Sequence, residues 1–246
     1  MRILIVRHAE PDYAADALTE KGKREAALLA ERLSRLPISA CYISTLGRAR
    51  ETAQFTLEKL DIDPAAICEC DWLREFPHLI ERPDKPGKVS IVWDWLPEDW
   101  TKEPAHFDRE KWTDTDIMKQ GRVKETYDQV IASFDSVLAS HGYERNGALY
   151  QAVHPNRDIL VFFCHFGLEC VLLSHLLNTS PMVLWHHTCA LTSSVTSLYT
   201  EERREGTAIF RMNAFGDISH LYAGDEEPSF AARFCETWEN MEERHD

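Results

Sequence analysis

Over the first 75 residues, short apolar runs alternate with stretches whose apolar residues recur at helical spacing. The run over residues 3–6 contains only isoleucine, leucine and valine, so it predicts a fully buried strand that stops at Arg7 and His8. The pattern then predicts a helix over 20–36, a strand at 40–43, a helix over 46–60 and a strand at 67–70. Strands that alternate with helices are typical of a parallel sheet with crossover helices.

Residues 76–120 interrupt this alternation. They contain five of the 11 prolines and four of the seven tryptophans. This composition is too apolar for a disordered linker, so it predicts an ordered insertion, and we favour a lid over the site rather than a plain structural cap. Arg82, Lys85 and Lys88 lie within it and offer a second anion-binding group, but we interpret them as a solvated face.

The alternation resumes after the insertion. The pattern predicts a helix over 121–141, strands at 147–153 and 159–164, a helix over 168–177, and a pair of strands at 193–200 and 207–213. The run at 159–164 is the most hydrophobic, so we expect it at the centre of the sheet, and it ends at His165. The sequence therefore predicts the α/β class: a three-layer α/β/α sandwich with a mostly parallel central sheet, formed by residues 1–246 as one domain with an insertion at about 76–120.

An acidic stretch near the C-terminus carries apolar side chains at helical spacing, which are Phe230, Phe234, Trp238 and Met241. Such a stripe predicts an amphipathic helix. Its apolar face would pack on the body of the molecule or form a homodimer contact, and the spacing alone favours neither.

Composition narrows the possible partners. The chain has 246 residues and a formal net charge of −14, which disfavours nucleic acid and anionic membranes as partners of the surface as a whole. No apolar run approaches the roughly 20 residues that span a bilayer, and the first residues lead directly into a strand, so we expect a cytoplasmic protein. The seven cysteines include no C-x-x-C pair, which indicates buried, reduced thiols rather than disulfides.

Charged side chains follow the buried strands. His8 and His165 each end one strand, Arg48 lies in the first turn of a helix that follows a strand, and Glu75 lies just past another. Since ligands of open α/β sheets bind at the carboxyl ends of parallel strands, we expect these groups to meet at one sheet edge. Together with Arg7 they would form an anion pocket that holds a nucleophile and an acid.

These motifs resemble those of the histidine phosphatase superfamily, which has the phosphoglycerate mutase-like fold. The family's Arg-His-Gly signature corresponds to Arg7, His8 and Ala9, its Ser-x-Leu-x-Arg-Ala-x-x-Thr-Ala element to residues 44–53, and its strand ending in His-Gly to residues 161–167. Ala9 departs from the family's usual glycine. If the backbone there needed a positive φ, alanine would cost about 1 kcal/mol.

The resemblance implies a role for each matched residue. His8 would attack phosphorus and become phosphohistidine, while Arg7, Arg48 and His165 would hold the phosphoryl oxygens. Glu75 would protonate the leaving oxygen and then deprotonate the attacking water. Arginines would take the place of a cation, so neither a metal ion nor another cofactor is expected. The resemblance thus implies a phosphatase of a small phosphorylated metabolite.

Two other residues compete for these roles. On a helix, Arg48 and Arg50 point about 200° apart, and the register of the motif favours Arg48 in the pocket and Arg50 at the surface. Glu10 is a weaker candidate for the acid than Glu75, and we interpret it as a loop cap.

Three other functions fit parts of the pattern. A phosphoglycerate-type mutase usually carries Glu-Arg-His-Tyr-Gly at the acid, whereas residues 75–79 read Glu-Phe-Pro-His-Leu. A non-catalytic module that binds a phosphate ligand usually lacks the nucleophile or an arginine, and both are present. A metal hydrolase built on His8, His165, His187 and a carboxylate would place its cation beside two arginines, which repel it. We interpret His186 and His187 as core or rim side chains.

Overall fold

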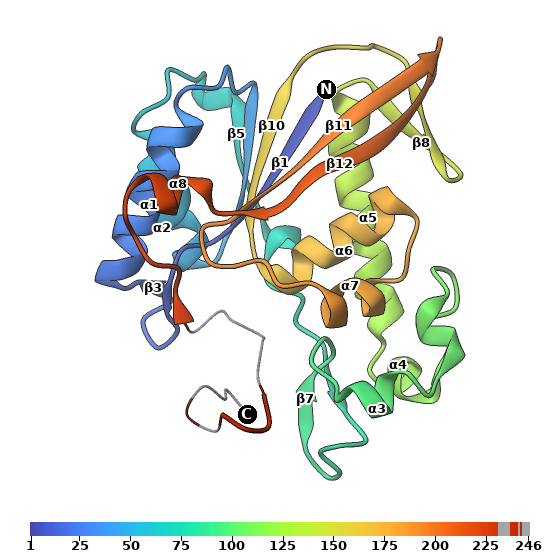
Figure 1. Ribbon diagram of the computed structural model, residues 1–246. Helices are drawn as coiled ribbons and strands as arrows, with labels where there is room; N and C mark the ends of the chain where they lie inside the picture. Colours follow the sequence, from blue (N-terminus) through green and yellow to red (C-terminus); the bar gives the residue numbers. More distant parts are fainter. Residues whose placement is uncertain (231–236, 241, 243–246) are drawn as a thin grey trace.

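The structure, a computed structural model, describes residues 1–230, 237–240 and 242. Its centre is an eight-stranded sheet with helices on both faces (Figure 1). In spatial order across the sheet, the strands are β5 (Ile67–Cys70), β4 (Ala40–Ser44), β10 (Ile159–Cys164), β1 (Arg2–Arg7), β11 (Val195–Arg204), β12 (Thr207–Asp217), β9 (Leu149–Ala152) and β8 (Tyr143–Asn146). The buried run at β10 is internal, as its hydrophobicity predicted.

Strand direction divides the sheet into two halves. The strands β5, β4, β10 and β1 pair in parallel, whereas β11, β12, β9 and β8 pair antiparallel. The α/β class is confirmed, but the sheet is mixed rather than mostly parallel. The reason is that β8–β9 and β11–β12 are hairpins whose turns contain Gly147 and Gly206, with φ of 61° and 72°. Such short turns can connect only antiparallel strands.

Alternate residues of β1 enter two separate cores. Leu4 and Val6 pack with the helices on one face, while Ile3 and Ile5 pack with those on the other. The first face is covered by α1 (Glu20–Leu33), α2 (Gly47–Leu57) and the short α8 (Ser219–Ala223), and the second by α5 (Val123–Ser140), α6 (Phe166–Leu177) and α7 (Pro181–His187) (Figure 1). A strand buried on both faces explains the uninterrupted apolar run that opens the chain.

The helix starts follow local capping chemistry. The Thr19 hydroxyl accepts a hydrogen bond from the Gly22 N–H at 3.0 Å and so caps α1. A small hairpin precedes this cap, formed by β2 (Pro11–Asp12) and β3 (Ala17–Leu18), and it lies beside the start of α2. Short 3-10 turns, η1 (Pro64–Ala66) and η2 (Asp71–Leu73), flank β5.

The insertion forms ordered structure that packs on α7. It contains the hairpin of β6 (Leu79–Glu81) and β7 (Val89–Ile91), followed by α3 (Pro97–Trp100), η3 (Pro104–Phe107) and α4 (Asp116–Gln120). The buried ring of Trp100 stacks on His186 with 4.9 Å between centroids and meets His187 edge-on. His186 also accepts the backbone N–H of Trp95 at Nε2 and donates from Nδ1 to the Met182 carbonyl. These two histidines therefore hold the insertion rather than a ligand.

The basic residues of the insertion do not form one solvated face. Lys85 and Lys88 are exposed, but Arg82 is only 2% exposed and pairs with Asp84 at 2.7 Å and Asp94 at 3.4 Å. The interpretation of Arg82 as a surface residue is wrong, because two nearby carboxylates make its burial possible.

The remaining expectations concern the C-terminal helix, the cysteines and membrane-spanning segments. Phe234 and Met241 of the predicted C-terminal helix lie outside the described residues. Cys41, Cys164 and Cys170 are buried, whereas Cys68 is exposed. Within the described ranges, none of the helices combines the length and the apolar character needed to cross a bilayer.

Candidate active site

The carboxyl ends of β1 and β10 bring the two predicted histidines together. The strands are parallel neighbours in which Arg7 lies opposite Cys164. The rings of His8 and His165 lie 5.1 Å apart between centroids, at an angle of 56°. Both side chains are nearly inaccessible to solvent, at 2% and 0% exposure.

The hydrogen bonds of His8 leave one ring nitrogen available. Its Nδ1 lies 2.8 Å from the carbonyl oxygen of Ala9, which can only accept, so Nδ1 carries the hydrogen and Nε2 keeps its lone pair. The backbone of His8 is held on both sides, because its N–H donates to Cys164 and its carbonyl accepts from Ser193. Burial and the adjacent Arg7 charge hold the pKa of His8 well below its usual value of 6.5. The imidazole is therefore neutral and nucleophilic at neutral pH.

His165 has one partnered and one unpartnered ring nitrogen. Its Nε2 lies 2.8 Å from the Ser44 hydroxyl, and its buried Nδ1 has no partner in the described part of the chain. Burial and the neighbouring His8 keep the pKa of His165 well below 6.5. When the Ser44 hydroxyl donates to Nε2, the Nδ1–H of a neutral His165 is free to bind an incoming oxygen.

Two guanidinium groups flank the histidines. Arg7 donates from Nη1 to the Ala190 carbonyl at 2.5 Å, and Arg48 donates from Nη1 to Asp16 at 2.6 Å. The Nε atom of each arginine is buried and lacks a hydrogen-bond partner among the residues that the structure describes. Unused cationic donors beside a nucleophile suit an anion, because charge-assisted hydrogen bonds to phosphate are strong.

Thr52 connects the nucleophile's strand to the helix of Arg48. Its hydroxyl accepts from the Ala9 N–H at 3.0 Å and donates to the Arg48 carbonyl at 2.7 Å. Ala9 is not among the described residues with positive φ, so alanine fits where the family usually has glycine.

The competing residues lie elsewhere, as the sequence predicted. Arg50 forms a 2.5 Å ion pair with Glu69 at the surface, where each side chain is about half exposed. The carboxylate of Glu10 accepts a hydrogen bond from the Thr19 hydroxyl at 2.8 Å and so fastens a loop. Neither residue contributes to the pocket.

The carboxyl group of Glu75 lies at the N-terminus of α6, on a residue that is partly exposed to solvent. Its Oε1 accepts from the N–H groups of Phe76 and Leu168 at 2.8 and 3.0 Å, and its Oε2 accepts from Gly167 at 3.3 Å. Burial raises the pKa of Glu75, and this outweighs the opposing effects of those N–H donors and of Arg7. A carboxyl group with a raised pKa is suited to donate a proton near neutral pH.

Several residues of the site carry no signal in the sequence patterns. Phe166 follows His165 and lies under the Arg7 guanidinium, 5.7 Å from it. Glu169, one turn further along α6, is 1% exposed, and neither of its oxygens has a hydrogen-bond partner in the described residues. Burial raises the pKa of Glu169 to about 7. The signal in the sequence that could have identified Glu169 is the presence of a carboxylate within the very apolar run of α6.

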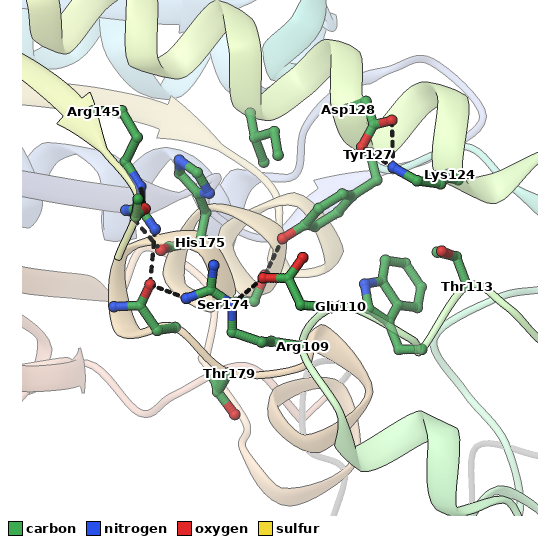
Figure 2. Close-up of a pocket in the computed structure, with 14 residues that line it drawn as sticks. Arg109, Glu110, Thr113, Lys124, Tyr127, Asp128, Arg145, Ser174, His175 and Thr179 are labelled. Carbon is green, nitrogen blue, oxygen red and sulfur yellow. Dashed lines mark hydrogen bonds and ion pairs between the residues drawn. The ribbon is translucent and has the colours of Figure 1, made fainter. Parts of the chain in front are cut away.

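A separate cavity lies away from these residues. Figure 2 shows this space of about 220 Å³ between α5, the C-terminal end of α6 and the segment 109–113 of the insertion. Arg109 pairs there with Glu110 and Lys124 with Asp128, and Arg145 donates to the Asn178 amide oxygen and to the carbonyls of Gly147 and His175. None of the five predicted site residues is among the described residues that line it. The groups able to bind a phosphoryl group are therefore at the sheet edge and not in this cavity.

Comparisons with known proteins agree with the motifs. A profile described as the histidine phosphatase superfamily (branch 1) matches residues 3–213. The mitochondrial serine/threonine-protein phosphatase Pgam5 of Drosophila willistoni is 33% identical over 103 residues, which cover 39% of this chain and 33% of that protein. The match thus spans about a third of the length of this curated relative.

Solved structures show the same fold. The mycobacterial glucosyl-3-phosphoglycerate phosphatase matches with a TM-score of 0.53 and 19% sequence identity. The match covers 87% of this chain and 98% of that chain. The phosphoserine phosphatase of Entamoeba histolytica has a TM-score of 0.56 at 16% identity, covering 89% of this chain and 98% of its own. At such low sequence identity, the similarity shows a shared fold and nothing more specific.

Proposed function

The chain belongs to the histidine phosphatase superfamily, and from this premise we propose that it is a metal-independent phosphatase that hydrolyses a small phosphomonoester through a phosphohistidine at His8. The observation that carries the proposal is the protonation state of His8, together with the groups around its ring. Its Nδ1 is engaged by the Ala9 carbonyl, so the lone pair of Nε2 is free, and a second histidine and two arginines surround it. A neutral imidazole among cationic donors is the arrangement that nucleophilic attack on a phosphoryl group requires.

In the first step, Nε2 of His8 forms a bond to phosphorus while the bond from phosphorus to the ester oxygen breaks. Arg7, Arg48 and His165 hold the three remaining phosphoryl oxygens and offset the charge that develops on them. Glu75 gives its proton to the departing oxygen, so the alcohol leaves neutral. The raised pKa of Glu75 favours the protonated form that this step consumes.

In the second step, water attacks the phosphohistidine. The ionised Glu75 takes a proton from this water, the bond between Nε2 and phosphorus breaks, and inorganic phosphate leaves with His8 neutral again. The same carboxyl group thus serves as acid and then as base, and no other co-reactant is consumed.

The residues that follow the acid favour a phosphatase over a mutase. The residue after Glu75 is Phe76, which is buried, and the next is Pro77. The segment that follows the acid therefore has no arginine at the position where the mutase motif carries one to retain a phosphorylated product; Arg74, which precedes Glu75, is exposed, and its charge contributes to the lowered pKa of His165. The complete set of nucleophile, arginines and acid likewise disfavours a non-catalytic module.

Access to His8 limits the size of the substrate. The imidazole is 2% exposed, so the phosphoryl group must be carried by a small molecule or by a slender side chain. The name of the Pgam5 relative makes protein phosphoserine and phosphothreonine the second candidate class. A panel of small phosphate esters and a phosphoserine peptide compares the two classes directly.

The first experiment is hydrolysis of p-nitrophenyl phosphate in the presence of EDTA. We expect turnover to persist in the chelator, His8→Ala to abolish it, and Glu10→Gln to leave it within about two-fold, since Glu10 only fastens a loop. Rapid quenching without acid should trap one phosphate per chain on His8. Complete loss of turnover in EDTA would favour the metal hydrolase instead. Turnover without phosphate on His8 would contradict the phosphohistidine step, and a protein that neither hydrolyses an ester nor carries phosphate on His8 would leave only a binding module.

A further inference from the structure

Trp93 of the insertion contacts the same helix N-terminus that holds Glu75. Its indole ring meets the ring of Phe166 edge-on, with 6.1 Å between centroids. A Cβ placed on Gly167 would stand 2.7 Å from Nε1 of Trp93 and 2.7 Å from Oε1 of Glu75. The indole nitrogen and the carboxyl oxygen therefore share the space above Gly167, and only a glycine leaves room for both.

The indole N–H of Trp93 is a buried donor without a use. Its Nε1 has no hydrogen-bond partner in the part of the chain that the structure describes. By contrast, the indole N–H of Trp95 donates to the Val92 carbonyl, and that of Trp185 donates to the Gly167 carbonyl, each at 2.9 Å. A buried donor without a hydrogen-bond partner lowers the stability of the folded protein. Since this donor lies beside an acid, we look for an acceptor that becomes available to it during the reaction.

The chemistry of Glu75 supplies that partner. When Glu75 gives up its proton, negative charge appears on a carboxylate that accepts three backbone N–H groups among the described residues, two at Oε1 beside the indole and one at Oε2. An ionised carboxylate can accept about four hydrogen bonds, so one further donor can bind. Other charged or titratable groups facing this carboxyl are Arg7 on β1, with Glu169 and Cys170 on α6 and Cys164 on β10. An additional donor stabilises the ionised form specifically, and an interaction present only after proton transfer lowers the barrier to it.

We propose that Trp93 is a positioning residue for the acid step: its indole N–H donates to the Glu75 carboxylate as this group ionises, and its ring keeps water out of the space above Gly167. This inference rests on the proposed function, because it needs Glu75 as the general acid. It also gives the insertion a direct part in the reaction, since Trp93 lies between β7 and α3.

The test compares two esters that differ in their need for an acid. The leaving group of p-nitrophenyl phosphate departs without much protonation, whereas that of glycerol phosphate depends on it. Trp93→Phe keeps an aromatic ring and removes the donor. We expect it to lower kcat for glycerol phosphate about ten-fold more than kcat for p-nitrophenyl phosphate, as befits one hydrogen bond to a charged group. Trp95→Phe, in the same insertion, should show no such preference between the esters.

A second variant separates action through Glu75 from direct contact with substrate. Glu75→Gln should show the same dependence on the leaving group. In that background Trp93→Phe should lower the residual activity no further, because the carboxylate it serves is absent. A further loss in the double variant would mean that Trp93 contacts the substrate itself, and it would overturn the inference.

Other outcomes are equally decisive. An equal loss on both esters would mean that Trp93 only supports the fold, and no loss on either would mean that its N–H plays no part. Both results overturn the inference. The proposed function still stands in either case if the wild-type enzyme is active in EDTA. Failure of the wild-type enzyme to hydrolyse any ester would overturn both.

Discussion

The hydroxyl of Ser44 lies 2.8 Å from Nε2 of His165, and both side chains are fully buried. Ser44 ends β4 and His165 follows β10, so this contact joins the ends of two neighbouring parallel strands. The hydroxyl fixes the orientation of the His165 ring, and with it the direction of the free Nδ1.

We therefore expect Ser44→Ala to lower kcat for phosphate esters about ten-fold, since His165 loses the partner that orients it. Steady-state kinetics on p-nitrophenyl phosphate measure this effect. Ser194→Ala is the matched control, because the Ser194 hydroxyl is also buried but lacks a hydrogen-bond partner in the described structure. Equal effects of the two variants would contradict an orienting role for Ser44.

Thr52 should matter for both stability and activity. In Thr52→Val the Ala9 N–H loses its acceptor inside the protein, which should cost about 1–3 kcal/mol of unfolding free energy. Because Ala9 follows the nucleophile, kcat should fall as well. Urea unfolding and steady-state kinetics measure the two effects, and Thr52→Ser, which keeps the hydroxyl, should restore most of both.

Thr56 provides the control one turn further along α2. It is buried like Thr52, yet its hydroxyl has no partner within the described ranges. Thr56→Val should therefore leave stability unchanged or increase it. A Thr52→Val protein as stable as Thr56→Val would show that the contact with Ala9 contributes nothing.

Glu169 should make the protein less stable as the pH rises. Burial raises its pKa from an ordinary 4.5 to about 7. Between these values the folded chain holds a proton that the unfolded chain has released, so stability is full below pH 4.5 and is lost as the pH rises through 7. Glu169→Gln removes this penalty and should raise the unfolding free energy at pH 8 by roughly 3 kcal/mol, with a much smaller gain at pH 4.5.

Urea unfolding at the two pH values measures this difference. The exposed Glu98→Gln serves as the control, because it changes the same charge at the surface. If Glu169→Gln changed stability equally at both pH values, Glu169 would not titrate in this interval.

The sequence predicted the part of the fold in which side-chain patterns carry strong signals. The strands β1 and β10 are buried on both faces, so they appear as unbroken apolar runs, and each is followed directly by a histidine. The strand β8 was not predicted, because Tyr143–Asn146 lies at the edge of the sheet and is largely polar. Nothing in such a short segment distinguishes an edge strand from a turn.

The motifs also predicted that the five candidate residues meet at one sheet edge, but they said nothing about the contacts of residues outside the motifs. Arg82 was assigned to the surface because its partners, Asp84 and Asp94, become visible as partners only once the insertion is folded. Trp93 lies beside Gly167, which is far away along the chain, and no local spacing predicts that contact. Positions fixed by tertiary packing are therefore the ones that sequence patterns miss.

Arg48 and Arg50 offer a matched pair on one helix. Arg48 lies at the pocket with its side chain 11% exposed, whereas Arg50 pairs with Glu69 at the surface with its side chain 48% exposed. Arg48→Ala should lower kcat/KM for phosphate esters about 100-fold or more, the usual effect of removing a donor to a developing charge. Arg50→Ala should stay within about two-fold. Reversal of this order would mean that the motif register has been assigned to the wrong arginine.

The pH dependence of turnover should reveal the acid more directly than any substitution alone. The pKa of His8 lies well below 6.5, so the nucleophile remains neutral as the pH falls from 8 to 6.5 and imposes no loss there. The pKa of Glu75 is raised by burial, so the protonated form is depleted only as the pH rises through that raised value. Turnover of an alkyl phosphate should therefore fall with increasing pH.

Profiles of kcat/KM against pH for glycerol phosphate test this expectation. The phosphate ester itself titrates near pH 6, so the wild-type profile alone mixes two ionisations. Glu75→Gln meets the same ionisation of the substrate but has no carboxyl proton to lose, so its lower activity should lack the fall at high pH. The difference between the two profiles then belongs to Glu75. An unchanged fall in Glu75→Gln would assign the high-pH ionisation to another group and remove Glu75 from the role of acid.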